Sequence, residues 1–381
     1  MTDLLLTEEE KILQSTVRDF ADKVLAPRAA AYDQSGEFPA DNVAGIAGLG
    51  LFGLGIDEAY GGSGGTARQG AIVVEELARG CAGTSTVYVA HQSLAAHYIN
   101  MFGSDEHKQK YLPGMVTADT IAAFALTEPG AGSDAAGIQT TATRDGDDYV
   151  LNGSKIFITN AAEAGVLVVL ASLDLSLRSK AFVALIVDGD TPGLTITPMH
   201  GKMGIRASST CEVFFDNCRV PIANRMGDEY EGFKLTMDVL NASRIGIAAQ
   251  AVGIAQAAYE EAVKYAKQRE AFGKHLADHQ GIQWMIADMA TEVEAARLLV
   301  LQAATLRDQG MPFVTEASMA KLFASRVAVE TADKAVQIHG GVGYFSPTTV
   351  ERLYRDAKIT EIYEGTSEVQ RMIISRSVLA D

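Results

Sequence analysis

One carboxylate near the end of the chain has neighbours that could present it to a bound molecule. Glu364 is followed by Gly365, Thr366 and Ser367, in a stretch that ends one helical pattern and starts another. Gly365 permits a tight backbone, and Thr366 or Ser367 could cap the helix that follows. A glutamate at such an exposed junction can face a substrate. The alternative is a solvated surface side chain, which is the usual state of glutamate in a protein.

A second segment combines small residues with hydroxyl groups. Residues 124–134 read FALTEPGAGSD and follow directly on an apolar run. Small residues let the backbone approach a ligand closely, and Thr127 and Ser133 can donate hydrogen bonds. The same composition also suits a polar turn that links two domains.

A third segment, KIFITN at residues 155–160, is expected on a β-strand. Side chains alternate along a strand, so we expect Phe157 and Thr159 on one face. An aromatic ring and a hydroxyl on the same face suit a planar ligand ring that forms hydrogen bonds. A buried strand with one satisfied threonine would have the same sequence.

The first of three parts that must position these segments is helical. In residues 1–119, Thr7 and Glu10 form a capping box, which satisfies free backbone N–H groups at the start of a helix. Apolar residues then recur at helical spacing up to Pro27, where we expect this helix to end.

The second part, residues 120–226, has the pattern of strands. Short runs rich in Val, Ile, Thr and Phe are separated by turn clusters at 144–148 and 188–192. Asn152-Gly153 between two of these runs is typical of a hairpin turn. We therefore expect a middle antiparallel β domain.

The third part, residues 227–381, is again helical. No proline occurs from 222 to 311, which permits long helices, and residues 282–300 carry an apolar stripe at helical spacing. The predicted fold class is a multi-domain α+β protein, with an N-terminal α-helical domain, the middle antiparallel β domain and a C-terminal helical domain.

Composition narrows the range of functions. The 381 residues include 48 acidic and 32 basic side chains, a formal net charge of -16, so we expect no nucleic-acid partner. No run of about 18 apolar residues predicts a membrane span, and the first residues lack the parts of a signal peptide, so we expect a cytoplasmic protein. Three cysteines without a CxxC pair predict neither a disulfide framework nor a metal site.

Residues 48–53 match the GxGxxG dinucleotide fingerprint by letter. That motif binds phosphate where a strand precedes it and a helix follows it. Here a helical pattern precedes the glycines and a loop follows them, so we expect no dinucleotide site at this place.

The three segments, in this order and in an α–β–α chain, resemble the acyl-CoA dehydrogenase family over essentially the whole chain. Further matching pieces are LNASR at 240–244, REAFGK at 269–274, HQ at 279–280 and QIHGG at 337–341. The C-terminal half looks most like the short-chain and butyryl-CoA dehydrogenases of bacteria.

The resemblance implies a fold, a cofactor and partners. It implies the acyl-CoA dehydrogenase fold, in which the C-terminal domain is a four-helix bundle, and binding of FAD. Proteins of this size in the family are usually homotetramers. The implied substrate is an acyl-CoA thioester with a short, branched or alicyclic acyl group, and the implied electron acceptor is an electron-transfer flavoprotein.

The implied cofactor contacts fall into two groups. Residues expected around the flavin are Phe124, Leu126, Thr127, Ser133, Phe157 and Thr159, and the remaining FAD contacts are implied for Thr366 and Glu368. Residues expected at the adenine and pyrophosphate half, much of it on the FAD of a neighbouring subunit, are Arg269, Phe272, Leu276, Gln280, Gln337, Gly340 and Gly341. Contacts with the CoA thioester are implied for Ser133, Asn241, Arg244 and Gly365.

Glu364 matches the catalytic base of the family. The implied reaction is α,β-dehydrogenation, in which Glu364 removes the α-proton while the β-hydride moves to flavin N5, giving a 2-enoyl-CoA. A thioester α-proton is too weak an acid for a carboxylate in water, so donors must stabilise the developing enolate. The family uses the backbone N–H of the base and a ribityl hydroxyl of FAD for this purpose.

Three positions bear on how far the resemblance can be carried. Phe157 stands where many members have Trp, and Asn241 replaces a frequent Asp. One branch of the family places its base just before the arginine, where this chain has Ser243, which cannot serve as a base.

His91 is a separate candidate. It could line the acyl pocket as a second acid or base, or pack between helices as an ordinary histidine.

Two alternatives to this function stay open. One is a flavin oxidase of the same superfamily, which would pass electrons to oxygen; nitroalkane oxidases have Asp at the base position, so Glu364 argues against that version. The other is a non-catalytic acyl-CoA-binding relative, against which Glu364, Arg269 and the 127–133 loop argue.

Overall fold

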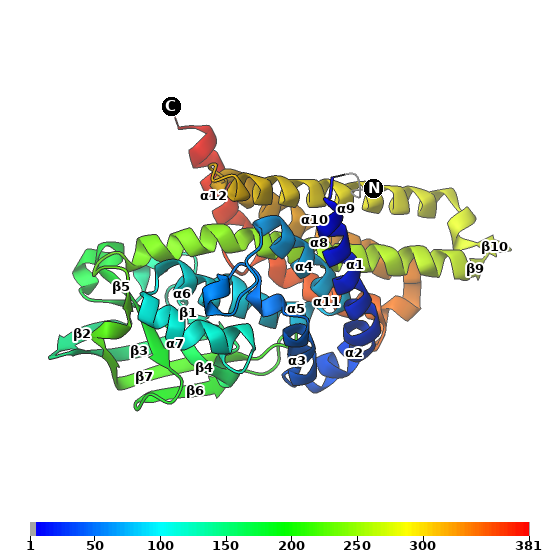
Figure 1. The fold of residues 1–381 in the computed structure, drawn as a ribbon. Coiled ribbons are helices and arrows are strands. Elements are labelled where there is room, and N and C mark those ends of the chain that lie inside the picture. The colour runs from blue at the N-terminus through cyan, green and yellow to red at the C-terminus, as the bar shows by residue number, and fades with distance from the viewer. Residues whose placement is uncertain (1–4, 381) are drawn as a thin grey trace.

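The computed structural model describes residues 5–380. A helical part, a sheet and long helices follow one another along the chain, as the sequence predicts (Figure 1). The sheet lies at one end of the molecule, and the short hairpin of β9 (Glu270–Ala271) and β10 (Lys274–His275) lies at the opposite end. Residues 1–4, on which part of the expectation about targeting rests, lie outside the described residues. The domain limits at 119/120 and 226/227 stay a prediction.

The N-terminal part consists of short helices, two pairs of which are joined by π-helical turns at Ala21–Leu25 and Ala90–Ala96. The expected capping box of Thr7 and Glu10 is confirmed at the first helix. The helices described in this part are α1 (Glu8–Phe20), α2 (Ala26–Ser35), α3 (Ala40–Gly48), α4 (Ala67–Gly80), α5 (Ala82–Val89), α6 (His97–Phe102) and α7 (Asp105–Val116).

The predicted helix end at Pro27 is wrong. The helical path runs from α1 through the π-helical turn into α2, and Pro27 lies in the first turn of α2. Proline is tolerated at this position because the turn just before it is π-helical, with the N–H of Ala26 bonded to the carbonyl of Ala21, so the α-helical pattern of hydrogen bonds is already interrupted there. The helix ends instead at Gly36, whose φ of 69° is the left-handed conformation that often closes a helix.

The GxGxxG sequence at residues 48–53 follows a helix and not a strand, as predicted. Gly48 ends α3, and Leu51–Gly53 form a 3-10 turn. A helix C-terminus presents free carbonyl groups, whereas phosphate binding needs the free N–H groups of a helix N-terminus.

Eight of the described strands form one sheet in the order β6-β7-β3-β2-β4-β5-β8, with β1 beside β4. Most pairs are antiparallel, as expected, but β1 and β2 both run parallel to β4. The strands are β1 (Ile121–Ala125), β2 (Thr141–Asp145), β3 (Asp148–Thr159), β4 (Ala164–Ser172), β5 (Phe182–Asp188), β6 (Leu194–Pro198), β7 (Thr210–Pro221) and β8 (Arg225–Met226).

The hairpin turn predicted at Asn152-Gly153 is wrong, because β3 runs straight through these residues. The chain turns between β2 and β3 in the earlier turn cluster, residues 144–148, where Gly146 has a φ of 63°. Gly153 lies at an irregularity in the pairing of β3 with β7. A Cβ there would lie 2.6 Å from Thr140 Oγ1, so the glycine serves a close contact between strands.

The proline-free stretch forms two of the long C-terminal helices, as predicted. These helices and α10 pack on one another, and the shorter helices α11 and α12 both pack on α10. Figure 1 shows the long helices side by side. The helices are α8 (Gly232–Gln268), α9 (Gln280–Asp308), α10 (Val314–His339), α11 (Thr349–Lys358) and α12 (Ser367–Val378).

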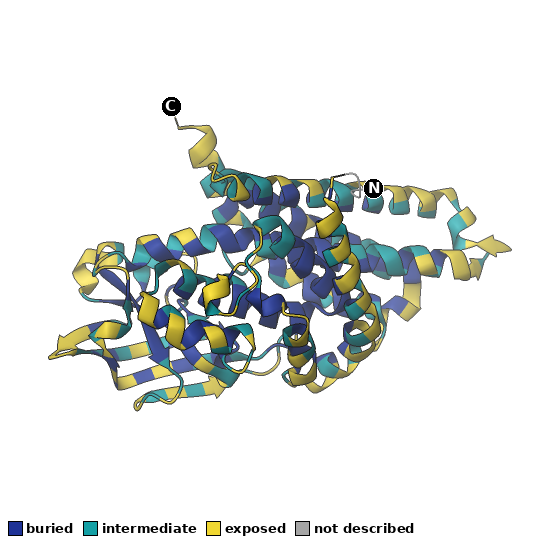
Figure 2. Ribbon diagram, in the orientation of Figure 1, coloured by how far each residue is buried: buried dark blue, intermediate teal, exposed yellow. Residues whose placement is uncertain are grey.

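Helix α8 is the centre of the molecule, because it contacts α4, the sheet and the other long helices. Its middle is buried, whereas the end near β9 is exposed (Figure 2). Small residues allow the close packing: a Cβ on Gly253 would lie 2.2 Å from the carbonyl oxygen of Glu75 on α4. Burial of α8 from both sides fixes the positions of the side chains near its start, including Arg244.

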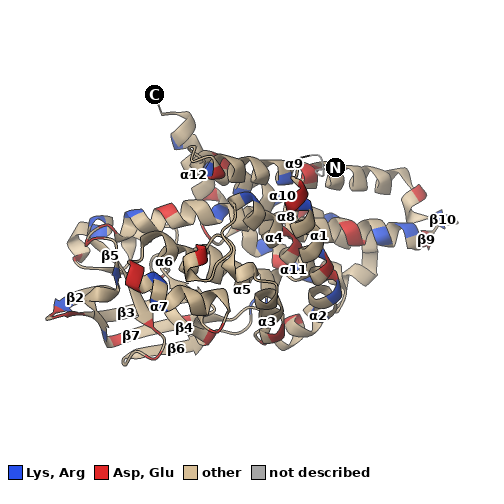
Figure 3. Ribbon diagram, viewed as in Figure 1, with Lys and Arg blue, Asp and Glu red and all other residues tan. Residues whose placement is uncertain are grey.

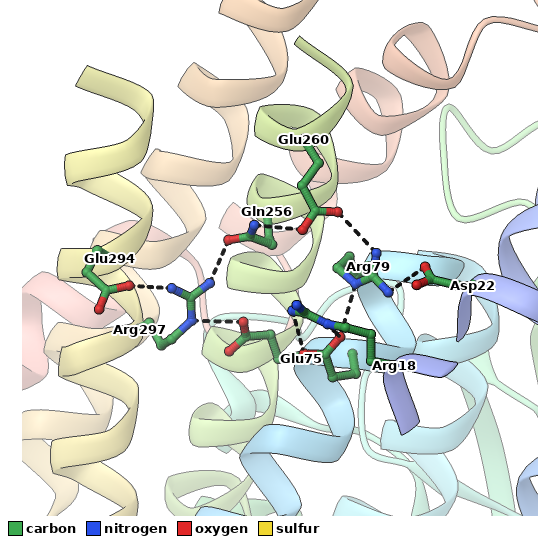
Figure 4. A network of polar contacts seen from close by, with 9 residues as sticks. Arg18, Asp22, Glu75, Arg79, Gln256, Glu260, Glu294 and Arg297 are labelled. Atoms are coloured by element: carbon green, nitrogen blue, oxygen red, sulfur yellow. Dashed lines mark hydrogen bonds and ion pairs between the residues drawn. The ribbon is translucent and has the colours of Figure 1, made fainter. Parts of the chain in front are cut away.

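Charged side chains also connect α8 to its neighbours (Figure 4). Arg297 of α9 donates to Glu75 of α4 at 2.9 Å, to Gln256 of α8 at 2.7 Å and to Glu294 of its own helix. The side chains of Arg297 and Glu75 are 12% and 8% exposed, so this pair is shielded from water. Buried ion pairs of this kind are costly to break from one side, because the remaining charge keeps its desolvation penalty.

A second arginine extends the network toward the N-terminus. Arg79 of α4 pairs with Glu76 at 3.0 Å, with Asp22 at 2.6 Å and with Glu260 of α8 at 3.1 Å. Arg18 of α1 pairs with the other oxygen of Glu76 at 2.8 Å. The polar network therefore joins the N-terminal helices to the C-terminal bundle.

Elsewhere, charged residues are dispersed over the molecule. In the view of Figure 3, basic segments lie among acidic ones and form no continuous basic face. Within residues 5–380, the helices lack a stretch long and apolar enough to cross a membrane. The same residues contain no cluster of His, Cys, Asp and Glu that could hold a metal ion.

We predict that Arg297→Ala destabilises the protein by about 3 kcal/mol, because Glu75 keeps its burial and loses its partner. The measurement is the urea midpoint of unfolding at constant protein and FAD concentration. Arg326→Ala is the matched control, since the Arg326–Glu330 pair is 46% and 40% exposed and should contribute less than about 1 kcal/mol. Equal midpoints for the two variants would contradict the account.

Candidate active site

A cavity of about 520 Å³ lies between the sheet, α8 and the segment that leads into α12. Its walls combine apolar side chains with a few hydroxyl and charged groups. Of the residues expected to contact cofactor or substrate, those that line it are Phe124, Leu126, Thr127, Ser133, Phe157, Thr159, Arg244, Glu364, Gly365 and Thr366. Segments that are far apart in the sequence thus meet at one cavity.

The loop after β1 is held in place by a buried ion pair. Lys155 on β3 is fully buried, and its Nζ donates to Glu128 Oε1 at 2.8 Å and to the carbonyl of Leu126 at 3.1 Å. Burial lowers the pKa of Lys155 to about 8. Burial alone would raise the pKa of Glu128, but Lys155 and the N–H of Thr140 keep it below its ordinary value.

The strand face predicted for Phe157 and Thr159 is interrupted. The pairing of β3 with β7 shifts between Lys155 and Ile158, and Phe157 has a φ of 61°. Phe157, Ile158 and Thr159 all line the cavity, and Phe157 is 61% exposed. The irregularity turns the aromatic ring out of the sheet and toward the open cavity.

Glu364 lies at the junction between two helical segments, as predicted. Its φ is 52° and that of Gly365 is 96°, so two successive left-handed residues turn the chain into α12. The Thr366 side chain accepts from the N–H of Val369, which confirms one of the two predicted caps. Gln370 donates to the carbonyl of Gly365 at 2.9 Å and so fixes the turn from within α12.

The surroundings of Glu364 differ from the exposed junction that we expected. The residue is half-buried, with its open side toward the cavity. Burial raises the pKa of its carboxyl to about 7, although Ser243, which donates a hydrogen bond to Oε2, and the cations Lys321 and Arg244 act to lower it. A carboxyl that titrates near neutral pH can act as a general acid or base there.

Arg244 brings a cation to the same cavity. It is buried, it donates to Asn241 Oδ1, and its Nε lacks a protein partner among the described residues. Asn241 itself does not line the cavity and acts on it through Arg244. A buried guanidinium with an unused N–H group is a candidate for a hydrogen bond to a ligand.

The remaining expected cofactor residues lie elsewhere. Arg269 follows the last residue of α8, at the β9–β10 end, and residues 337–341 span the end of α10. Stacking of Tyr265 on His339, with 4.1 Å between ring centroids, keeps these two helix ends together. At 1.5 Å per residue, Arg244 and Arg269 are about 38 Å apart along α8, so one cavity cannot include both.

Phe272, Leu276 and Gln280 belong to this distant group. Phe272 is 96% exposed, whereas Leu276 packs on the bundle core and Gln280 begins α9. Glu368 lies in the first turn of α12 and is not among the residues that line the cavity.

His91 has a structural role. It is fully buried, its Nδ1 accepts from the N–H of Ala122 at 3.0 Å, and its Nε2 lies 3.1 Å from the carbonyl of Met115. Burial lowers the pKa of His91 to about 4, so the ring is neutral and joins α7 to β1. It does not line the cavity beside Glu364.

Four polar residues shape the site although the sequence analysis gave them no role there: Glu128, Lys155, Ser243 and Lys321. The first two lie inside the motifs already noted, where a charged residue among apolar and small neighbours was a signal of a buried pair. Lys321 is flanked on its helix face by buried alanines 317, 320 and 324, which is a signal of a buried lysine. Only the three-dimensional contact reveals that Ser243 touches Glu364.

Three family models match the chain in order. They describe the N-terminal domain of acyl-CoA dehydrogenase over residues 7–119, the middle domain over 123–218 and the C-terminal domain over 230–379. The chain belongs to the acyl-CoA dehydrogenase family. The acyl-CoA dehydrogenase of short-chain specificity from Clostridium acetobutylicum is 45% identical over 376 residues, which cover 99% of each protein.

Two solved structures show the same fold. The butyryl-CoA dehydrogenase of Megasphaera elsdenii has a TM-score of 0.96 and 43% identity, covering 98% of this chain and 99% of that one. A chain solved in work on the electron transferring flavoprotein of Acidaminococcus fermentans has a TM-score of 0.97 and 45% identity, covering 99% of both chains. This chain is thus similar, over nearly its whole length, to acyl-CoA dehydrogenases that are named for short-chain and butyryl substrates.

The family is FAD-dependent, and the cavity of this acyl-CoA dehydrogenase fits such a cofactor. Phe157 offers an exposed aromatic face, and the hydroxyls of Thr127, Ser133 and Thr159 can bond to the polar edge of a ring. The unused Nε of Arg244 adds a donor on the side of Glu364. The donor set suits a flat, largely apolar ring system beside an anionic or carbonyl-bearing ligand.

We predict that Lys321→Met raises the pKa of Glu364 further, because a cation that favours the carboxylate is removed while the burial remains. The measurement is the pH dependence of the carboxyl C=O stretch in infrared difference spectra. Lys334→Met is the control, since Lys334 lies on the same helix and pairs with Glu292 at 3.3 Å. An unchanged or lowered pKa in Lys321→Met would contradict this electrostatic picture.

Proposed function

We propose that Glu364 is the base of an FAD-dependent α,β-dehydrogenation of short-chain acyl-CoA thioesters. The observation that carries the proposal is a single carboxyl with a pKa of about 7 on the wall of the cavity that Phe157 and Thr159 also line. FAD, when bound, supplies the acceptor for the hydride that leaves the β-carbon of the substrate. The product is a 2-enoyl-CoA.

The flavin end of the cofactor would be held by the loop after β1 and by the end of β3. Leu126, Thr127 and Ser133 would contact its edge, and Phe157 and Thr159 its ring. The Lys155–Glu128 pair supports this arrangement, because it ties the loop to the strand.

Glu364 would take the α-proton of the thioester. Its main-chain N–H would donate to the thioester carbonyl oxygen, where charge develops as the proton leaves, and such donors lower the barrier most in a site without water. Burial supports the role, because it keeps a carboxylate basic enough to accept a proton near neutral pH. Arg244 would orient the thioester end of the ligand or hold the carboxylate ionised before the reaction.

The distant group of expected cofactor residues supports a homotetramer with FAD bound between subunits. Arg269 lies about 28 Å along the direction of α8 from Gln250, the last residue of that helix on the cavity wall. Phe272, Gln280, Gln337 and Gly340 do not line the cavity either. They would therefore serve the cofactor of a neighbouring copy. The exposed side chain of Phe272 fits a residue that meets another molecule.

Electrons would pass from the reduced flavin to an electron-transfer flavoprotein. The similar chain that was solved in work on the electron transferring flavoprotein of Acidaminococcus fermentans supports this acceptor. We also propose a cytoplasmic location. The unpaired, buried state of Cys81, Cys211 and Cys218 agrees with it. A flavin oxidase of the same fold would instead consume oxygen in step with substrate.

The test is an anaerobic titration of the FAD-loaded protein with butyryl, isobutyryl, isovaleryl, hexanoyl and cyclohexanecarboxyl-CoA. We expect rapid loss of the oxidised-flavin absorbance with butyryl-CoA. Glu364→Gln should keep FAD and ligand binding and slow the loss by a factor of about 100 to 10,000, because the amide cannot accept the proton.

Glu330→Gln is the control, since Glu330 is a surface residue that pairs with Arg326 at 3.4 Å and does not line the cavity. It should retain the rate of the unchanged protein. Rapid flavin reduction in Glu364→Gln would refute the assignment of the base. Substrate-dependent oxygen consumption without need of an electron-transfer flavoprotein would favour the oxidase.

A further inference from the structure

A second pocket reaches the side of α8 that faces away from the reaction cavity. It has a volume of about 350 Å³. Ser243 and Gly246 of α8 line this second pocket, whereas Arg244 and Ile247 of the same helix line the reaction cavity. The helix therefore separates the two spaces, and the residues of α8 that face the second one are Ala242, Ser243, Ile245 and Gly246.

Ser243 connects the two spaces. It is buried, it lines the second pocket, and its Oγ donates to Glu364 Oε2. The carbonyl of Leu240 lies 3.1 Å from the same oxygen and is a second acceptor for the hydroxyl proton. A hydroxyl has one proton and two lone pairs, so Ser243 can donate to an ionised Glu364 or accept from a protonated one.

The second pocket is polar and suited to water. Gln92 is buried there, and its Nε2 donates to the carbonyl of Leu54, while its Oε1 lacks a protein partner among the described residues. A buried oxygen in this state is usually satisfied by an ordered water molecule. The pocket also includes Thr66 and Asp308, both exposed, so it opens to solvent at that end.

A proton on Glu364 needs a way out of the reaction cavity during turnover. FAD and the acyl thioester would fill it on the side of Glu364 that faces the substrate. The proton that Glu364 takes must still leave before the next cycle. The Ser243 hydroxyl, which contacts the Glu364 carboxyl, also lines the second pocket, and that pocket opens to solvent.

We propose that Ser243 and the second pocket carry the proton from Glu364 to solvent while the ligand is still bound. This inference rests on the proposed role of Glu364 as base. The Glu364 O–H bond breaks and its proton goes to Ser243 Oγ, while the hydroxyl proton of Ser243 passes to a water molecule in the pocket. Ser243 is unchanged, Glu364 is again a carboxylate, and the water passes one proton to bulk solvent.

The charges around Glu364 favour this direction. Lys321 from α10 and Arg244 from α8 both stabilise the carboxylate, so both favour loss of the proton. Tyr363 from the preceding turn is buried, which raises the pKa of its hydroxyl, and it stays neutral. Glu361 and Glu368 act on Lys321 and keep it cationic against its own burial.

The second pocket has its own charged groups. Arg307 donates to Nε2 of His97 at 2.9 Å. Burial lowers the pKa of His97 to about 3, so that ring is neutral and does not trap the proton. Asp308 at the mouth accepts from the N–H groups of Ala67 and Arg68, and its carboxylate balances Arg307.

The experiment measures hydrogen exchange without net reaction. The probe is (methylthio)acetyl-CoA, which has acidic α-protons and no β-hydrogen to transfer. In D₂O, each exchange of its α-protons requires Glu364 to take a proton and to trade it for a deuteron from solvent. Mass spectrometry of the recovered thioester gives the rate for the FAD-loaded protein.

Ser243→Ala should slow this exchange by at least about tenfold more than it slows anaerobic flavin reduction by butyryl-CoA, because reduction needs only proton abstraction. Ser243→Thr keeps the hydroxyl and should restore exchange. Ser318→Ala is the control, since Ser318 is a buried serine of α10 that lines neither pocket. Gly246→Val, which fills the second pocket, should slow exchange with Ser243 intact.

Unchanged exchange in Ser243→Ala, or equal slowing of exchange and flavin reduction, would overturn the inference. Normal exchange in Gly246→Val would exclude the second pocket as the route. Failure of the proposed function gives a different result: the unchanged protein would then show neither flavin reduction by butyryl-CoA nor exchange of the probe.

Discussion

The arrangement of this protein depends on keeping one carboxylate away from bulk water. The Glu364 carboxyl is held between the long helix α8 and the turn before α12, and burial raises its pKa to about 7. Lys321, Arg244 and Ser243 oppose that rise without removing it. In water the same group would be ionised, well solvated and a weak base. The balance between desolvation and the nearby cations therefore sets the basicity of Glu364.

The rest of the fold serves that balance. Helix α8 is packed from both sides, and the ion pairs of Arg297 and Arg79 join it to the N-terminal helices. The buried Lys155–Glu128 pair fixes the loop that closes the cavity on the side of the sheet. The same helix separates the reaction cavity from the second pocket, and it carries both Arg244, which lines the cavity, and Ser243, which donates to Glu364.

Much of the architecture could be predicted from local patterning. Spacing of apolar residues and the absence of proline indicated the long helices, and the capping box at Thr7 was correct in detail. Predictions failed where a contact distant in sequence overrides a local signal. Gly153 serves a close approach of Thr140 and not a turn, and Pro27 is accommodated by a π-helical turn just before it.

The site shows the same limit. The motifs with Thr127, Phe157 and Glu364 were visible in the sequence, and the family resemblance joined them. Burial of Glu364, the hydrogen bond from Ser243 and the proximity of Lys321 were not visible, because each depends on how α8, α10 and the turn before α12 pack. The pKa of the carboxyl is therefore a property of the folded chain and not of a motif.

The most direct test of the account is the pH dependence of flavin reduction by butyryl-CoA in an anaerobic single turnover. A base with a pKa of about 7 must be ionised to act, so the rate should rise with pH through about 7 and level off above it. A rate that does not change between about pH 5.5 and 8.5, or that falls as the pH rises, would contradict the assignment of Glu364 as a base tuned by burial.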